Sequence, residues 1–200
     1  MLRKSSRAEA IRSFAQLRDD DFVVLFFGRI DERKGIATFL SAADALAHLP
    51  GYSFIVAGSN GIASQNSALR KRLASYKSRP GFVVHDTRIP FSEVERYFAA
   101  ADLVVLPYHE GTTSGVLKLA MAFHKPVVAT SVGDIPEALA SGAGELLRQG
   151  ATAPELVSAI KLIRSRPETY VAAAKRAGEG CDWLTVARSY FAFLFQGPPA

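Results

Sequence analysis

The sequence contains a single cysteine, Cys181, which excludes an intrachain disulfide and a CxxC metal or redox motif. Its four histidines, His48, His85, His109 and His124, have no HExxH or other ligand spacing, so we expect no structural metal site. No apolar run approaches the roughly 20 residues that span a bilayer. The N-terminal stretch Met-Leu-Arg-Lys-Ser-Ser-Arg also lacks the apolar core of a signal peptide. We therefore expect a cytoplasmic protein.

The composition is that of a folded chain with a basic balance. Hydrophobic residues make up 48% of the 200 residues, enough for one sizeable α/β core, although length alone leaves one or two domains open. The net charge of +5 favours acidic partners such as nucleotides, phosphosugars or an anionic membrane surface. The cations are spread along the chain, which argues against a nucleic-acid partner.

An apolar run over residues 22–27 ends at Gly28 and is followed at once by the cations Arg29 and Lys34. A continuous Val/Leu/Phe run predicts a strand buried on both faces, as in parallel sheets. Residues 36–47 then place apolar side chains at helical spacing. Both cations are therefore expected at the carboxyl end of a strand and near a helix N-terminus, where anions bind.

Two readings of these cations remain open on the loop alone. Two positive charges at such a place suit a phosphate group. The plainer interpretation is that Arg29 and Lys34 are solvated and balance the neighbouring Asp31 and Glu32.

The rest of the chain repeats the alternation of strand and helix. A lead-in helix is expected over residues 5–17, and Ser92 with Glu95 reads as a capping box. Further strands are expected at residues 52–57, 82–85, 103–107, 126–130 and 145–148, with helical patterns between them and to residue 177. About six strands then form one doubly wound, Rossmann-like parallel sheet with helices on both faces.

A second anion site is expected after the fourth strand. Thr112, Thr113 or Ser114 can cap the helix that follows, and Gly115 lets a ligand approach its backbone amides. Capping alone needs no ligand and is the default interpretation of any one of these residues.

Several of these segments together resemble a known family, group 1 (GT4-like) glycosyltransferases of the GT-B fold. The motifs occur in the family's order: Gly28-Arg29 with Lys34-Gly35, Ala57-Gly58, Ile89-Pro90 with Glu93, residues 101–107, Ala120-Met121-Ala122, residues 126–130, Val132-Gly133 with Ile135-Pro136-Glu137, and Asp182-Trp183. The resemblance covers roughly residues 21–195. It implies the C-terminal, donor-binding half of such an enzyme.

The resemblance also implies roles for individual residues. Arg29 and Lys34 would hold the diphosphate of a UDP- or GDP-sugar and stabilise charge on the leaving group, in a retaining transfer without metal or cofactor. Glu110 would be a third catalytic group. Donor contacts would come from Gly28, Thr87, Arg88, Ile89, Thr113, Ser114, Gly115, Val116 and Lys118, with residues 87–89 lining the base largely through main chain.

Two departures from the family pattern concern residues near this site. Most members have two glutamates eight positions apart before the Ala-Met-Ala segment, the second of which contacts the donor ribose; here these positions hold Gly111 and Leu119. Glu110 recovers the first position only through a one-residue insertion, and its partner is then Lys118. His124 replaces a preferred glycine, which predicts a left-handed backbone there.

The length of the chain implies a missing acceptor domain. We expect residues 1–20 to be an interdomain segment, 21–180 the donor domain, and 181–200 an aromatic helix and tail whose run from Trp183 to Phe195 would dock on a partner or self-associate. Alone, the chain would bind donor but hardly transfer sugar, in the cytoplasm or at the inner face of the membrane. The alternatives are a non-catalytic partner subunit and, with little support, a flavodoxin-like receiver domain.

Overall fold

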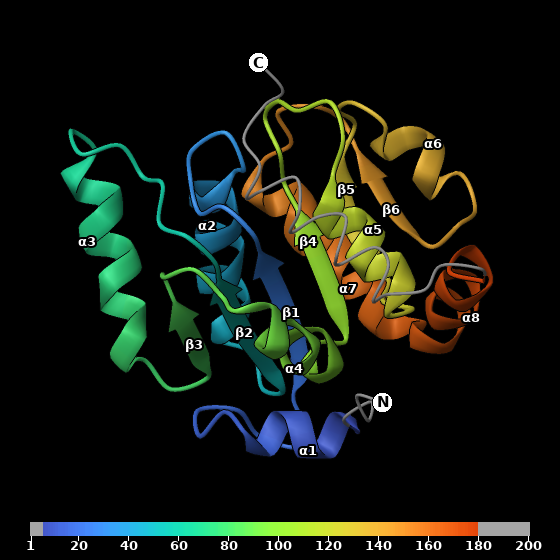
Figure 1. Cartoon of the computed structure of the whole chain (residues 1–200), viewed down its shortest axis with the longest axis horizontal. Helices are drawn as coiled ribbons and strands as arrows, with labels where there is room; N and C mark the ends of the chain where they lie inside the picture. Colours follow the sequence, from blue (N-terminus) through green and yellow to red (C-terminus); the bar gives the residue numbers. More distant parts are fainter. Residues whose placement is uncertain (1–5, 180–200) are drawn as a thin grey trace.

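The computed structural model describes residues 6–179, in which strands alternate with helices along the chain (Figure 1). The strands are β1 (Phe22–Phe27), β2 (Tyr52–Ala57), β3 (Phe82–His85), β4 (Leu103–Leu106), β5 (Val127–Thr130) and β6 (Gly144–Leu147). The helices are α1 (Arg7–Arg12), α2 (Ile36–Ala47), α3 (Ser67–Ser75), α4 (Phe91–Ala100), α5 (Gly115–Ala122), α6 (Ile135–Leu139), α7 (Ala153–Ser165) and α8 (Pro167–Ala177), with a 3-10 turn at Tyr76–Ser78.

All strand pairs are parallel, and the sheet order is β3-β2-β1-β4-β5-β6. The chain therefore winds outward from β1 in one direction and then from β4 in the other. The strands run upward in Figure 1, so the loops after them gather at the upper edge. Ligands of such sheets bind outside the carboxyl ends where the winding reverses, which here is between β1 and β4. The predicted fold is confirmed.

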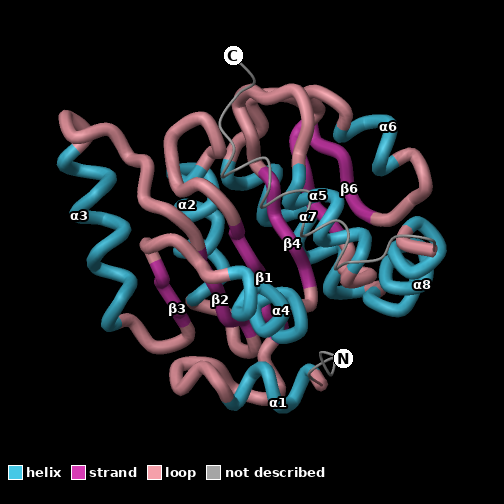
Figure 2. The backbone as a smooth tube through the Cα atoms, in the orientation of Figure 1, coloured by secondary structure: helices cyan, strands magenta, loops and turns pink. Residues whose placement is uncertain are grey.

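Helices cover both faces of the sheet (Figure 2). The side chains of β1 alternate between the two cores. Val23, Leu25 and Phe27 pack with α1, α4 and α5, whereas Val24 and Phe26 pack with α2, α3 and α7. A strand buried on both faces has no polar side, which is why its sequence is an unbroken apolar run.

Two local predictions were wrong. The lead-in helix α1 covers only residues 7–12, where a capping box between Ser6 and Glu9 starts it. Helix α4 begins at Phe91 after Pro90, without a side-chain cap. The proline already fixes the backbone before the helix, and Glu93 in its first turn pairs with Arg96 at 2.7 Å.

The expected aromatic helix from Trp183 to Phe195 lies outside the described residues.

No helix between residues 6 and 179 combines the length and apolar character that crossing a bilayer requires.

Lys125 is a partly buried cation at the opposite, amino edge of the sheet, just before β5. Its ammonium lies 3.5 Å from the Ala99 carbonyl oxygen. Burial lowers the pKa of Lys125 to about 8. The Asp102 carboxylate raises this pKa, whereas the Arg7 guanidinium lowers it. The Asp102 carboxylate is already engaged by Arg7, at 2.7 Å.

We predict that Lys125→Met stabilises the fold near pH 7. Between pH 8 and the ordinary lysine pKa of 10.5 the unfolded chain binds more protons at this residue than the folded chain does. The free energy of unfolding of the wild type should therefore rise with pH across that window, whereas the variant should lack this rise. Below pH 8 the variant should exceed the wild type in free energy of unfolding by on the order of 2 kcal/mol.

Urea unfolding at several pH values measures this difference. The exposed Lys71→Met is the control, and an identical pH slope in wild type and Lys125→Met would contradict the prediction.

Candidate functional site

The loops after β1, β2 and β3 are joined by backbone hydrogen bonds at the carboxyl edge of the sheet. The Gly28 amide donates to the Ala57 carbonyl and the Gly58 amide to the His85 carbonyl, both at 2.9 Å. A Cβ at position 58, where φ is +147°, would lie 1.6 Å from the Gly28 carbonyl oxygen. Only glycine lets the two strand ends approach this closely. The β1–α2 loop therefore starts from a fixed position.

Asp31 is the centre of the β1–α2 loop. It is 4% exposed, and its Oδ1 accepts a hydrogen bond from the Lys34 backbone amide at 2.9 Å. Its Oδ2 lies 2.9 Å from Arg29 Nε and 3.8 Å from Arg33 Nη2. The Arg29 side chain is 62% exposed and passes close to Gly61 in the β2–α3 loop. One buried carboxylate thus holds three residues of this cationic loop.

The Lys34 ammonium lies over the ring of Tyr108, 3.7 Å from its centroid. In the part of the chain that the structure describes, no carboxylate lies within ion-pairing distance of it. Burial lowers the pKa of Lys34, Asp31 raises it and Arg33 lowers it further. A partly desolvated cation resting on an aromatic face interacts more strongly with an incoming anion than a solvated one does.

The β4–α5 loop is tied to this cation. The His109 amide donates to the Arg33 carbonyl at 2.8 Å, which fastens the two loops together. Tyr108 is buried, and its hydroxyl lies 3.4 Å from Ser114 Oγ at the start of α5. Tyr108 therefore contacts both Lys34 and the N-cap of α5.

The N-terminus of α5 presents backbone amides rather than a free hydroxyl. Ser114 is the N-cap, and its Oγ accepts from the Leu117 amide at 3.2 Å. Gly115 and Val116 open the helix, and amides in a first turn have no partner within the helix. A phosphate at this point would meet main-chain donors and the positive end of the helix dipole. Thr113 is exposed beside it.

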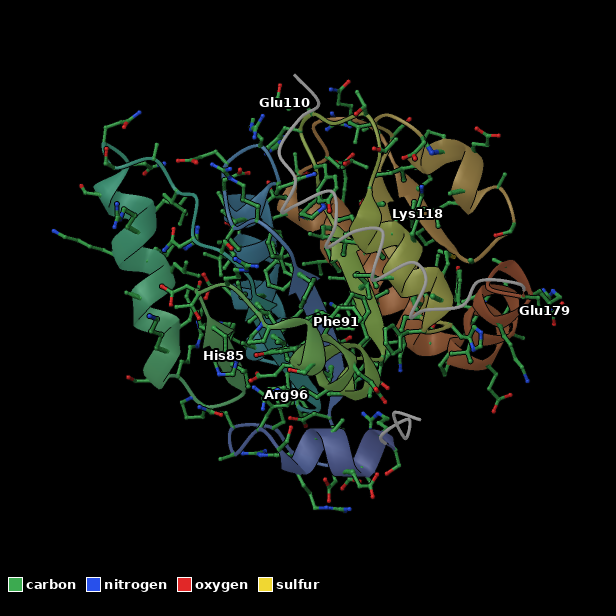
Figure 3. The ribbon with its side chains drawn as sticks, in the orientation of Figure 1. His85, Phe91, Arg96, Glu110, Lys118 and Glu179 are labelled. Carbon is green, nitrogen blue, oxygen red and sulfur yellow. The ribbon has the colours of Figure 1, made fainter. Side chains whose placement is uncertain are left out.

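Glu110 and Lys118, both predicted as site residues, are exposed. Glu110 is exposed at the upper edge of the molecule, and its Oε1 lies 3.6 Å from Arg33 Nε (Figure 3). Lys118 is exposed on α5. Leu119 is fully buried in the apolar core. The position at which the family has its second glutamate is therefore part of the core in this chain.

The predicted base-binding loop follows β3. Thr87 and Arg88 are exposed, whereas Ile89 is buried in the core and anchors the loop. Before the loop, Asp86 pairs with Lys77 at 2.7 Å. His85 lies 2.6 Å from the Tyr97 hydroxyl, and burial together with Arg96 lowers its pKa.

Comparison with known proteins identifies the family. Residues 21–165 match the family of glycosyl transferases group 1. The chain belongs to this family.

Curated relatives of this group 1 glycosyltransferase domain are longer proteins. The D-inositol 3-phosphate glycosyltransferase of Mycobacterium marinum is 33% identical over 184 residues, which are 88% of this chain and 38% of that protein. The enzyme of the same name from Thermobifida fusca is 28% identical over 187 residues, 89% of this chain and 43% of that protein. The chain thus spans about two fifths of their length.

Solved structures of GT-B glycosyltransferases contain a part that has the same fold as this domain. Sucrose-phosphate synthase from Thermosynechococcus elongatus superposes with a TM-score of 0.70 at 26% identity, covering 96% of this chain and 51% of that one. The Anabaena protein HepE in complex with UDP-glucose gives 0.72 at 22% identity, over 96% and 52%. The C-terminal domain of the group 1 protein LpcC from Francisella tularensis gives 0.69 at 19% identity, over 93% of each.

Three residues of this candidate site were not predicted from the sequence: Asp31, Arg33 and Tyr108. One of the two interpretations of the loop made Asp31 a counter-charge to solvated Arg29 and Lys34, but the structure buries Asp31. Nothing local identifies Tyr108, because its role depends on β4 lying beside β1. The left-handed backbone predicted for His124 is confirmed by a φ of +54°.

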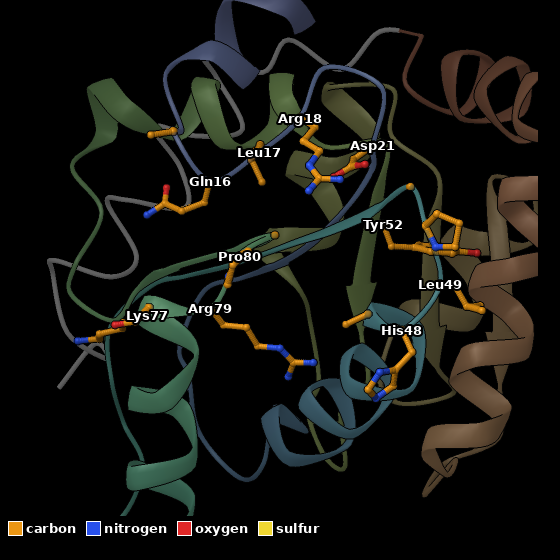
Figure 4. Close-up of a pocket in the computed structure, with 16 residues that line it drawn as sticks. Gln16, Leu17, Arg18, Asp21, His48, Leu49, Tyr52, Lys77, Arg79 and Pro80 are labelled. Atoms are coloured by element: carbon orange, nitrogen blue, oxygen red, sulfur yellow. The ribbon is translucent and has the colours of Figure 1, made fainter.

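A pocket lies at the opposite, amino edge of the sheet (Figure 4). It encloses about 880 Å³ between the segments that precede β1, β2 and β3. Two of the cations that line it are already paired, Arg79 with Asp44 at 2.5 Å and Lys77 with Asp86 at 2.7 Å. Arg18 lines it as well. Within residues 6–179, no cluster of three or more His, Cys, Asp or Glu side chains could hold a metal ion.

Proposed function

We propose that this chain is the nucleotide-sugar donor domain of a retaining glycosyltransferase. The observation that carries the proposal is the convergence of Lys34 with the N-terminus of α5. The ammonium lies on the Tyr108 ring, whose hydroxyl reaches the N-cap Ser114. Among residues 6–179, Lys34 has no carboxylate partner, and the first amides of α5 have no partner within the helix; such a pair of groups is chemically suited to a diphosphate.

In this proposal Arg29 and Lys34 act when the sugar leaves. Breaking the bond between the sugar and the nucleoside diphosphate leaves negative charge on the β-phosphate oxygens. Cations and amides already aimed at that place stabilise the transition state without reorganising. Thr87 and Arg88 are exposed after β3, which lies beside β2, the strand that Gly58 follows. The main chain of residues 87–89 would hold the base of the nucleotide there. Glu110 is the acid nearest to Arg33, on the solvent side of the site.

The acceptor is proposed to bind a second domain. The curated relatives are more than twice the length of this chain, and the GT-B structures extend beyond the matched half. The isolated chain should therefore bind donor and transfer little sugar. A non-catalytic donor-binding subunit is the second candidate, favoured by the buried Leu119 at the position of the second glutamate. Both candidates place donor binding in this chain. They are separated by mixing the chain with an acceptor domain and measuring whether sugar is transferred.

Donor binding is tested by thermal unfolding and calorimetry with UDP, GDP, UDP-glucose and GDP-mannose. UDP is the first probe, because HepE was solved with UDP and with UDP-glucose. At 100 times its Kd a ligand stabilises the folded state by about 2.7 kcal/mol, which should raise the Tm of a chain of this size by roughly 5 to 10 °C. Uridine and guanosine are the controls and should give almost no shift. Failure of every diphosphate to bind would contradict the proposal.

A further inference from the structure

We propose that Asp31 is a positioning residue of the diphosphate site. Its buried carboxylate aims the Arg29 guanidinium and shapes the loop that carries Lys34. This inference rests on the proposed function, because it concerns how that same site is built.

The contacts of Asp31 occupy both of its carboxylate oxygens. Oδ1 accepts from the Lys34 backbone amide at 2.9 Å, and Oδ2 lies 2.9 Å from Arg29 Nε. Arg33 Nη2 is farther away, at 3.8 Å. The Asp31 backbone carbonyl also accepts from the Ile36 amide, at 3.4 Å, at the start of α2. Asp31 therefore fixes the whole loop from β1 to α2.

A buried carboxylate is an unexpected group beneath an anion site. Burying it is costly, and its charge repels a phosphate. The turn around Lys34 alone does not require it, since asparagine or serine could accept the same backbone hydrogen bond. An ionised carboxylate adds a charge-assisted bond to the Nε edge of Arg29. That bond leaves the two Nη groups of the guanidinium fork for a ligand, and within residues 6–179 Arg29 has no second charged partner.

Two roles for Asp31 predict opposite results. If its charge acts only at a distance, its removal should tighten the binding of a diphosphate. If it positions Arg29, its removal should weaken binding although an unfavourable charge has gone. The variant Asp31→Asn separates the two, because it keeps the size and the Oδ1 acceptor for the Lys34 amide.

The experiment measures UDP binding by titration calorimetry, with GDP in parallel. We expect Asp31→Asn to weaken the binding of the diphosphate that the wild type binds by about tenfold, the loss of roughly one charge-assisted hydrogen bond. The matched control is Glu32→Gln, which removes the same charge from the next residue. Glu32 bonds to Asn66 at 2.9 Å and not to Arg29, so this variant should bind UDP as well as the wild type or better.

A double-mutant cycle with Arg29→Ala tests whether Asp31 acts through Arg29. In the Arg29→Ala background, Asp31→Asn should have little further effect on Kd, because the two residues act as one unit. Thermal unfolding checks that each variant is folded. Should Asp31→Asn fail to fold, Asp31→Glu keeps the charge but displaces it by one methylene group, and it should show the same weakening.

The outcomes separate this inference from the proposed function. Equal or tighter binding by a folded Asp31→Asn, or an equal loss with and without Arg29, would overturn the positioning role and leave donor binding intact. Absence of UDP and GDP binding by the wild type would overturn both.

Discussion

Replacing Arg29 and Lys34 together with alanine is expected to abolish the binding of nucleoside diphosphates. Each side chain can supply one charge-assisted contact worth about 1.5 to 3 kcal/mol. The double variant should therefore weaken Kd by roughly 100-fold to 10,000-fold, which titration calorimetry would record as no measurable heat. Most of the loss should come from Lys34→Ala, because Lys34 is partly desolvated on Tyr108 while Arg29 is 62% exposed and already bonded to Asp31.

The stability of these variants should distinguish a binding role from a structural one. Burial lowers the pKa of Lys34, which means that the fold disfavours its charge. Lys34→Ala should consequently lose binding without losing thermal stability. The double variant Lys71→Ala with Lys161→Ala removes the same charge from exposed positions on α3 and α7 and should bind normally. Equal weakening by both double variants would show that net charge, not this site, attracts the ligand.

The sequence allowed the fold to be predicted because its strongest signals are local. The unbroken run of β1 reports burial on both faces, and Gly28 marks the strand end. Ser114 was one of three residues expected to cap α5, and the structure selects it. A capping pattern was less reliable at Ser92, where the proline before it starts the helix instead.

The site was only partly predictable because its geometry depends on contacts between distant segments. Lys34 meets Tyr108 only because β1 and β4 are neighbours in the sheet. Asp31 reads as a surface charge in the sequence, and its burial follows from the packing of the loop on the ends of the strands. Glu110 was expected from the resemblance to be a catalytic group, and the sequence did not show that its side chain lies beside Arg33. Charged residues in loops have no periodicity that reports which way they face.

Gly35→Ala is expected to be severely destabilising and to disrupt the site at the same time. Gly35 lies between Lys34 and α2 with a φ of +72°, and a Cβ there would lie 1.9 Å from the Pro107 carbonyl oxygen. The left-handed strain and the collision with backbone should together cost about 3 to 5 kcal/mol in the free energy of unfolding. Relief of the collision would push the β1–α2 loop away from β4 and separate Lys34 from Tyr108. Urea unfolding measures the first effect, and UDP binding by the folded fraction measures the second.

Gly142→Ala is the matched control for this prediction, because it imposes the same backbone strain without a collision. Its φ is +77°, and nothing lies within 4 Å of a Cβ at that position. It should cost about 1 to 2 kcal/mol and leave UDP binding unchanged. The difference between the two variants measures how tightly the cationic loop is held against the end of β4. If both variants lost the same stability, the contact of Gly35 with Pro107 would not be what brings Lys34 to the start of α5.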